Sequence, residues 1–378
     1  MDDHPVHQIA EVIRHVGTSD RNFYDRYYFN CHPRLAGGDE DPTGPWLIFG
    51  LGVYPNLAVT DCFVVVRHGD DHIVVRGSRA LGDDRDDLRV GPFRIEVLEG
   101  LQRLRISLEP GHGDVSFDME FTADAPAALE PRHFQRQLER VTFDTQRFVQ
   151  TGAWSGSITL DGKRFDVDPD TWRGNRDRSW GVRPVGEAEP PGRRAADTDS
   201  AGFFWIYAVM RFDDFAVVSI VQEQRDGERV MGDARLIWAD PARGIEWLGR
   251  VEHEITFIPG GREPSSAILR FIKPSGATTV VEATPQLGNY IGFGTGYGLE
   301  QDWRHGMWQG DEKVEAQRLK VSELDPTMKL FCPVDHVASF TLTDADGTVH
   351  HGEGLFEFAV IGPHDQYGFA DYVDVTPV

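Results

Sequence analysis

The feature that most constrains the fold of this chain is a repeated strand–turn–strand pattern with an Asp-Gly pair at the turn. Three such pairs each separate two runs in which apolar and polar residues alternate: Asp161-Gly162, Asp226-Gly227 and Asp346-Gly347. An Asp-Gly pair readily adopts the positive φ angles of a tight hairpin turn, and alternation is typical of strands with one buried face. Further hairpins are predicted around residues 69–71 and 99–100. The chain is therefore expected to be mainly antiparallel β.

Helical periodicity is confined to short stretches. Apolar residues recur at helical spacing over residues 6–16, after Pro5, which predicts one short N-terminal helix. Residues 132–140 and 311–320 are also considered as short helical pieces. None of these alternates regularly with the strands, so a parallel α/β sheet is disfavoured.

The length of 378 residues favours two domains. The composition changes at residues 185–202, which are rich in Pro, Gly, Ala and charge and have no apolar period. The predicted organisation is an N-terminal helix at 1–20, a first domain at 21–186, a linker or long loop at 187–202 and a second domain at 203–378. Each half carries several hairpins, which indicates two successive β-barrels or sandwiches.

Charge and composition exclude several classes of partner. With 61 acidic and 38 basic residues the formal charge is −23, which repels nucleic acid and anionic lipid. No apolar run is long enough to span a membrane, and the N-terminus lacks the pattern of a secretory signal. Three separated cysteines suit a reducing compartment. A cytoplasmic protein without stable membrane insertion is expected; the oligomeric state, including a homodimer, is left open.

The segment 171–184 gathers four arginines in a chain that is acidic overall. In a strand, alternation sends Arg176, Arg178 and Trp180 to one face and Asp177 to the other. Two interpretations stay open: a ligand site, or an Arg-Asp network that ties one domain to the next. Asp177 lies between two arginines, so we expect it to stay ionised as the partner of Arg176 or Arg178.

Two further segments carry candidate site residues. In 202–214, Phe203, Trp205 and Tyr207 share one face of a strand, which either belongs to the core or lines a cavity for an apolar ligand. In 288–310, glycines on every second position suggest a strand with one smooth face. The candidate residues of this second segment, together with a tyrosine at a turn that could line a barrel mouth, are Tyr297, Glu300, Asp302, His305 and Tyr54.

The fourteen histidines do not form a recognisable metal-binding motif, and no metal site is expected. No nucleophile elbow, Walker loop or reactive cysteine context is present either. These absences disfavour the commonest hydrolase and kinase mechanisms.

The stretch GNRDRSWGVRP, residues 174–184, resembles the RDHSWG signature of the AttH-like and carotenoid hydratase (hydroxyneurosporene synthase) superfamily. The early YYFN and GLGVYPN stretches and GAWSGSI are similar to a bacterial branch of it. The resemblance implies two consecutive lipocalin-like β-barrels. It also implies additions, eliminations or ring closures on apolar polyenes or polyketides, without a metal or redox cofactor.

Carried over by position, the signature tryptophan is Trp180, and Arg178 stands where the family has histidine. The later strand of the family corresponds to residues 203–209, with Trp205 and Tyr207 but no carboxylate. Arg178 would suit an oxyanion, and Tyr207 or a group within 300–305 is a better proton donor than Asp177.

The sequence thus predicts a cofactor-independent lyase or isomerase acting on a hydrophobic isoprenoid, steroid-like or polyketide molecule. The predicted catalytic residues are Arg178, Trp180, Tyr207 and Asp177. The predicted substrate-binding residues are Arg176, Trp205, Phe203, Tyr54, Tyr297, Glu300, Asp302 and His305. Two alternatives remain: a lipocalin-type carrier of an apolar ligand, and a structural fusion of two barrels in which the signature only joins the domains.

Overall fold

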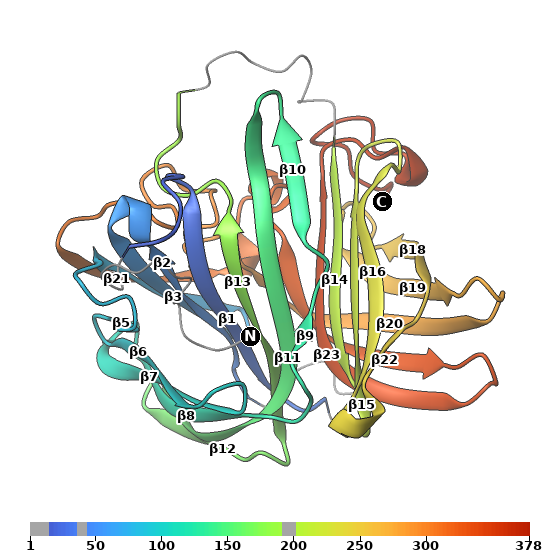
Figure 1. The fold of residues 1–378 in the computed structure, drawn as a ribbon, viewed down its shortest axis with the longest axis horizontal. Coiled ribbons are helices and arrows are strands. Elements are labelled where there is room, and N and C mark those ends of the chain that lie inside the picture. The colour runs from blue at the N-terminus through green and yellow to red at the C-terminus, as the bar shows by residue number, and fades with distance from the viewer. Residues whose placement is uncertain (1–14, 36–43, 191–201) are drawn as a thin grey trace. The chain divides into compact units, whose positions relative to one another are not determined.

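The computed structural model describes residues 15–35, 44–190 and 202–378, and in them the chain is mainly β (Figure 1). Two compact units are found: unit 1 comprises 1–33, 43–195 and 293–322, and unit 2 comprises 34–42, 196–292 and 323–378. Most of the predicted N-terminal helix (1–20) falls on residues 1–14, and most of the predicted linker on 191–201, which lie outside the described residues; residues 15–20 are described and are not helical.

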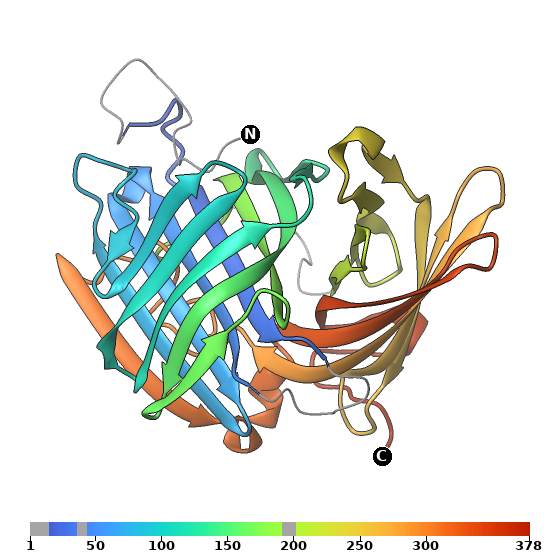
Figure 2. The same cartoon turned by 90° about the horizontal axis from the view of Figure 1, so that it is seen from below.

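Unit 1 is built on one antiparallel sheet of 14 described strands. They are β1 (Phe23–Pro33), β2 (Trp46–Tyr54), β3 (Val59–His68), β4 (Asp71–Ala80), β5 (Arg89–Val90), β6 (Phe93–Glu99), β7 (Arg103–His112), β8 (Val115–Ala123), β9 (Ala128–Leu129), β10 (His133–Gln137), β11 (Arg140–Leu160), β12 (Lys163–Val167), β13 (Trp172–Val182) and β21 (Glu312–Lys320). The main path runs β21-β4-β3-β2-β1-β13-β11-β8-β7-β6-β5. β5 returns towards β4, where Val90 lies against Gly77, so the sheet curves into a nearly closed barrel (Figure 2).

Unit 2 is a half-barrel of nine described strands, ordered β17-β16-β15-β14-β23-β22-β20-β19-β18 (Figure 2). They are β14 (Phe203–Arg211), β15 (Phe215–Glu223), β16 (Arg229–Trp238), β17 (Ile245–Trp247), β18 (Arg250–Phe257), β19 (Pro264–Ile272), β20 (Thr278–Tyr290), β22 (Val334–Thr343) and β23 (Val349–Ile361). The described helical elements are short: η1 (Pro55–Leu57), η3 (Pro241–Arg243), η4 (Val321–Glu323), α1 (Pro326–Lys329) and η5 (Asp365–Tyr367).

Hairpins form at all three predicted Asp-Gly pairs, and the tight two-residue turn is confirmed at Asp161-Gly162. Asp161 and Gly162 join β11 to β12 with φ angles of 48° and 76°, which is the left-handed region that this turn needs. Gly227 and Gly347 lie at φ 81° and 89° between the strands of their hairpins. The predicted antiparallel β architecture with two barrel-like sheets is therefore confirmed.

The predicted short helices at 132–140 and 311–320 are wrong. The first region holds β10 and the start of β11, and the second is β21, which pairs with β4 from Glu312↔Arg79 to Lys320↔Asp71. Because the pairing of β21 is with a strand more than two hundred residues earlier, residues 293–322 belong to unit 1, although the sequence analysis assigned them to the second domain. A non-local pairing leaves no local pattern in the sequence.

The smooth-faced strand predicted across 288–298 ends early. β20 stops at Tyr290, and Gly294, Gly296 and Gly298 have φ angles of 82°, 93° and 104°. Positive φ at every second residue is incompatible with an extended strand. The segment 293–311 is therefore a folded loop that leads into β21.

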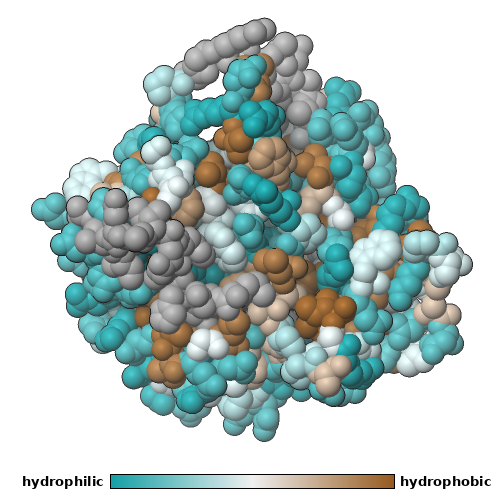
Figure 3. All heavy atoms as spheres, viewed as in Figure 1, coloured by the Kyte–Doolittle hydropathy of each residue, from teal (hydrophilic) through white to brown (hydrophobic). Residues whose placement is uncertain are grey.

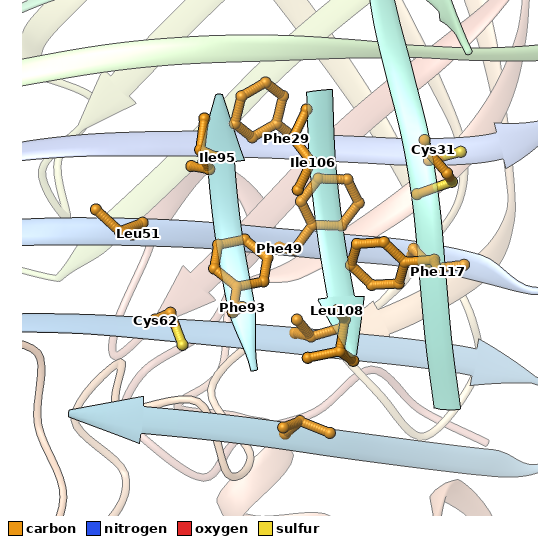
Figure 4. Close-up of a cluster of buried hydrophobic side chains, with 14 of the residues drawn as sticks. Phe29, Cys31, Phe49, Leu51, Cys62, Phe93, Ile95, Ile106, Leu108 and Phe117 are labelled. Carbon is orange, nitrogen blue, oxygen red and sulfur yellow. The ribbon is translucent and has the colours of Figure 1, made fainter. Parts of the chain in front are cut away.

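The core of unit 1 lies inside the barrel (Figure 4). Phe49 of β2 stacks on Phe29 of β1 and contacts Phe93 of β6 and Phe117 of β8. Burial of each such side chain stabilises the folded chain by about 1.5–3 kcal/mol. Strand alternation explains this core, because the odd-numbered residues of β1 point inward and the even-numbered ones point to the outer face.

The face of the molecule in Figure 3 is largely hydrophilic, with apolar residues scattered between polar ones. Among the described residues, no helix is long and apolar enough to cross a membrane.

Candidate functional site

The arginine-rich segment of the sequence is β13, which lies between β1 and β11 in unit 1. The predicted alternation is confirmed, because Arg176 lies opposite Phe29 and Arg178 opposite Tyr27, both core residues. Trp180 lies on the same inner face, and Asp177 lies on the outer face. The four predicted residues of this strand are thus divided between the two sides of the barrel wall.

Both inner arginines are enclosed and paired. Arg178 forms an ion pair with Asp25, and the two side chains are only 1% and 0% exposed. The guanidinium of Arg178 lies 4.0 Å from the centre of the Tyr27 ring. Arg176 donates through Nε and Nη2 to Oε1 of Gln150 at 3.0 and 2.8 Å. Since a buried charge persists only with partners of this kind, these contacts connect neighbouring strands from within the barrel.

The expectation that Asp177 pairs with Arg176 or Arg178 is wrong. Alternation turns its carboxyl group away from both, and the partner of Arg178 is Asp25. Burial raises the pKa of Asp177, although nearby arginines, chiefly Arg147, act to lower it. Desolvation therefore outweighs the effect of the neighbouring positive charges on this group.

On the outer face of unit 1 the structure brings together three residues that the sequence predicted separately. Tyr54 ends β2, and Tyr297 and His305 lie on the loop 293–311. Arg26 of β1 and Asp61 of β3 join them. We call these five residues the outer cluster.

Asp61 is the centre of the outer cluster. Its Oδ1 accepts a hydrogen bond from the Tyr54 hydroxyl at 3.1 Å, and its Oδ2 accepts one from the Gly306 N–H at 2.7 Å. The same Oδ2 lies 3.7 Å from Nδ1 of His305. Gly306 has a φ of 80°, and a Cβ there would lie 2.9 Å from the Tyr54 ring, so only glycine fits without strain. This close approach positions the loop against the sheet.

The contacts of His305 define its tautomer. Nε2 lies 3.4 Å from Nη2 of Arg26. Because a guanidinium can only donate, Nε2 presents its lone pair, and the ring proton sits on Nδ1, which faces Asp61. Burial, followed by the charge of Arg26, lowers the pKa of His305 to about 4, against the opposing effect of Asp61. At neutral pH the imidazole is therefore uncharged and can accept a proton at Nε2.

Arg26 completes the arrangement. Its Nη2 donates to the Tyr297 hydroxyl at 2.9 Å, and its guanidinium lies 4.9 Å from the centre of the Tyr297 ring. Burial alone lowers the pKa of Arg26, but the oxygens of Tyr297, Tyr54 and Asp61 outweigh it and raise the pKa above its usual range. Arg26 is thus a permanent positive charge between a phenol and an imidazole.

The outer cluster forms part of the wall of a pocket of about 550 Å³ that lies entirely within unit 1. Arg26, Tyr297 and His305 line it directly, together with residues of the segments 140–142, 183–189 and 21–22. A volume of this size is typical of small-molecule sites. The arrangement therefore exposes a neutral imidazole, a guanidinium and a phenol to a bound ligand.

Glu300 and Asp302 do not line this pocket. Glu300 accepts a hydrogen bond from the Gly294 N–H and lies 3.8 Å from Nη1 of Arg76, and burial raises its pKa. Asp302 is exposed. Of the polar residues predicted in 300–305, His305 is the one that the structure brings to the pocket.

Phe203, Trp205 and Tyr207 lie in unit 2, on the face of β14 opposite the core residues Phe204 and Ile206. Their rings form a row, with centroids 6.1 and 6.2 Å apart and nearly parallel planes. The predicted alternation of this strand is confirmed.

Sequence reasoning missed Arg26 and Asp61. Each is a charged residue within a strand whose other residues are almost all buried, and the two are 5% and 3% exposed. A charge in such a run is rarely left without a partner, and that signal was available in the sequence. Among the described residues, no group of three or more His, Cys, Asp or Glu is placed to hold a metal ion.

Comparison with known proteins places this geometry in context. The family model described as a family of unknown function (DUF8625) matches residues 1–370. The crystal structure of a candidate AttH from Nitrosomonas europaea is similar with a TM-score of 0.51 and 16% identity, over 89% of this chain and 92% of that one. The crystal structure of CghA gives a TM-score of 0.46 and 9% identity, over 90% and 88%. No curated protein matches the chain significantly in sequence. The AttH-like fold predicted from the sequence is confirmed.

Proposed function

The chain belongs to the DUF8625 family of unknown function, and we propose that it is an enzyme of the lyase or isomerase type. In this proposal its own side chains move a proton on a small molecule that has a carbonyl group and an apolar body. The reaction takes place in the pocket of unit 1, and His305 is the base.

The observation that carries this proposal is the convergence of three polar groups on one pocket wall. Nη2 of Arg26 lies 2.9 Å from the Tyr297 hydroxyl and 3.4 Å from Nε2 of His305. All three residues line the pocket. A base beside two hydrogen-bond donors is the arrangement that proton abstraction next to a carbonyl requires.

The proposed mechanism follows from these positions. A substrate carbonyl oxygen takes hydrogen bonds from Arg26 and Tyr297, which frees the lone pair of Nε2. His305 removes a proton from the adjacent carbon, and the electron pair moves onto the carbonyl oxygen as an enolate. The negative charge that develops favours the protonated imidazole. In an isomerisation, the imidazolium of His305 returns the proton to another carbon of the conjugated enolate. In a dehydration, it gives the proton to the β-hydroxyl group, which leaves as water while the enolate electron pair forms the carbon–carbon double bond; either route restores neutral His305.

Asp61 acts through His305 as a positioning residue. It holds the proton on Nδ1 and leaves Nε2 free to react, and it is itself fixed by Tyr54 and Gly306. The apolar body of the substrate would lie along Val141, Pro184 and Val185 of the pocket wall. The predicted residues Arg176 and Arg178 then serve the barrel structure, because their partners enclose them.

The test is deuterium exchange from D2O into a panel of alkyl and ring-bearing ketones and enones, followed by proton NMR. The wild type is expected to exchange at least one member at the carbon next to the carbonyl. His305→Ala is expected to slow this exchange about 10²–10⁴-fold while ligand affinity changes little. His112→Ala, a histidine at the end of β7 that does not line the pocket, is the matched control.

The carrier alternative predicts a different result. A carrier would bind panel members, or retain a co-purified apolar molecule in native mass spectrometry, with no exchange in either the wild type or His305→Ala. That outcome would contradict the enzyme proposal.

A further inference from the structure

Among the charged residues that line the pocket of unit 1, arginines outnumber carboxylates. Five are arginines and two are glutamates: Arg21, Arg26, Arg140, Arg183, Arg304, Glu187 and Glu189. Glu187 pairs with Arg21 at 3.2 Å, and Glu189 pairs with both Arg21 and Arg140. The two carboxylates are therefore already engaged.

Arg183 and Arg304 have no such partner among the described residues. Neither forms an ion pair with a carboxylate in the part of the chain that the structure describes. The guanidinium of Arg183 lies over the ring of Tyr24 at 5.5 Å from its centre. Nε of Arg304 is buried and meets no hydrogen-bond acceptor among the described residues. A buried donor without an acceptor is costly, which points to a group that the pocket binds.

The position of these two arginines relates them to the proposed base. Arg304 precedes His305 in the chain, and the charge of Arg183 contributes to the lowered pKa of His305. In a protein with a formal charge of −23, a pocket wall with two arginines that form no ion pair with a described carboxylate, Arg183 and Arg304, attracts anions locally. Guanidinium groups match the geometry of carboxylate and phosphate oxygens.

We propose that Arg183 and Arg304 bind an anionic oxygen group of the substrate, a carboxylate or a phosphate, in the pocket next to His305. Calling the bound molecule a substrate rests on the proposed function. The binding of the anion itself does not depend on turnover. The substrate is then an amphipathic acid: its anionic end meets the two arginines, and its carbonyl meets Arg26 and Tyr297.

The experiment is isothermal titration calorimetry of the full chain with hexanoate, pentyl phosphate and hexanamide. The three ligands share an apolar body, and only the first two are charged. At least one of the charged ligands is expected to bind at least about tenfold more tightly than hexanamide, and to bind more weakly as ionic strength rises. The more tightly bound of the two identifies the group as carboxylate or phosphate.

The variants are Arg183→Gln and Arg304→Gln, each expected to weaken binding of the preferred anion about tenfold. Arg183→Lys keeps the charge and is expected to retain part of the affinity. Arg103→Gln is the matched control, because Arg103 lies on β7, pairs with Glu120 and does not line the pocket. NMR titration of His305 gives a second measurement: a bound anion is expected to raise its pKa, and hexanamide is not.

Three results would overturn the inference: no binding of either anion, equal binding of hexanamide, or unchanged anion binding in both glutamine variants. The proposed function fails separately. If His305→Ala keeps both anion binding and full deuterium exchange, the role of His305 as base is wrong and the anion site stands. If exchange depends on His305 but the anion preference is absent, only the anion site is wrong.

Discussion

Unit 1 contains two buried arginines that lie near an aspartate, one on each side of the same sheet. Inside the barrel, Arg178 forms an ion pair with Asp25, and both are at most 1% exposed. Outside it, Arg26 lies near Asp61, with His305 between them and a pocket alongside. The residue types are alike, but the inner pair is enclosed by the core and the outer cluster faces a space that a ligand can enter.

The difference shows that buried charge alone does not identify a functional site. An enclosed ion pair whose partners are satisfied acts on stability, because removing one member leaves the other uncompensated. A charge at a pocket wall acts on whatever enters the pocket. The comparison therefore predicts that substitutions in the inner pair change the free energy of unfolding, and that substitutions in the outer cluster change turnover.

The largest effect is expected from Arg178→Ala. The change leaves the Asp25 carboxylate buried without its partner, and it should lower the free energy of unfolding by about 3–5 kcal/mol. Urea denaturation followed by tryptophan fluorescence measures it.

A double variant keeps this prediction informative if Arg178→Ala does not fold. Arg178→Met combined with Asp25→Leu removes both charges, so it should recover most of the lost stability and retain deuterium exchange. If Arg178→Ala instead keeps its stability and loses exchange, the inner pair is part of the catalytic machinery and the comparison breaks down.

Asp61→Asn is expected to have the largest effect on turnover within the outer cluster after His305 itself. An amide in place of the carboxylate no longer requires the proton of His305 to sit on Nδ1, so Nε2 is less available as a base. The exchange rate should fall about 10²-fold. Asp118→Asn is the control, since Asp118 is an exposed residue of β8 paired with Arg105. An unchanged rate in Asp61→Asn would mean that the tautomer of His305 is immaterial.

The features of unit 1 that follow from local sequence patterns could be predicted from the sequence. Alternation in β13 was sufficient to separate Arg176 and Arg178 from Asp177, and the Asp-Gly pairs were sufficient to place hairpins such as β11–β12. These features depend on residues that are adjacent in the chain.

The partners of the buried charges could not be predicted, because they depend on pairings between segments that are distant in the chain. Asp25, the partner of Arg178, lies on β1, and His305 reaches Asp61 because β21 pairs with β4 and carries the preceding loop back to the first sheet. Local periodicity contains no information on which strand becomes a neighbour. The same limitation explains why 311–320 was predicted as a helix.

The pH dependence of the free energy of unfolding should distinguish the outer cluster, which contains His305, from the inner ion pair of Arg178 and Asp25. The pKa of His305 is lowered to about 4 from an unfolded value of about 6.5, so the unfolded chain binds more protons between these values. The stability that depends on neutral His305 is complete above about pH 6.5 and is lost as the pH falls towards 4. Between pH 7 and pH 5 the expected loss is about 2 kcal/mol.

Burial also lowers the pKa of His72 and His133 to about 4, so the slope of the wild type contains their contributions. The difference between the wild type and His305→Gln, measured by urea denaturation at pH 7 and pH 5, isolates His305. The dependence of the free energy of unfolding on pH should be weaker in His305→Gln than in the wild type. It should be unchanged in the double variant Arg178→Met with Asp25→Leu. Equal slopes in the wild type and His305→Gln would show that the imidazole is not held in its neutral form.

The smallest effect is expected from Tyr54→Phe, which removes one hydrogen bond to Oδ1 of Asp61 and leaves the Gly306 N–H on Oδ2. The free energy of unfolding should fall by about 1 kcal/mol, and the exchange rate by only a few-fold, because the second oxygen still faces His305. Denaturation and deuterium exchange on the same preparation measure both. If Tyr54→Phe slowed exchange as much as Asp61→Asn does, both oxygens of Asp61 would be needed to orient His305, and Tyr54 would be as important a positioning residue as Asp61.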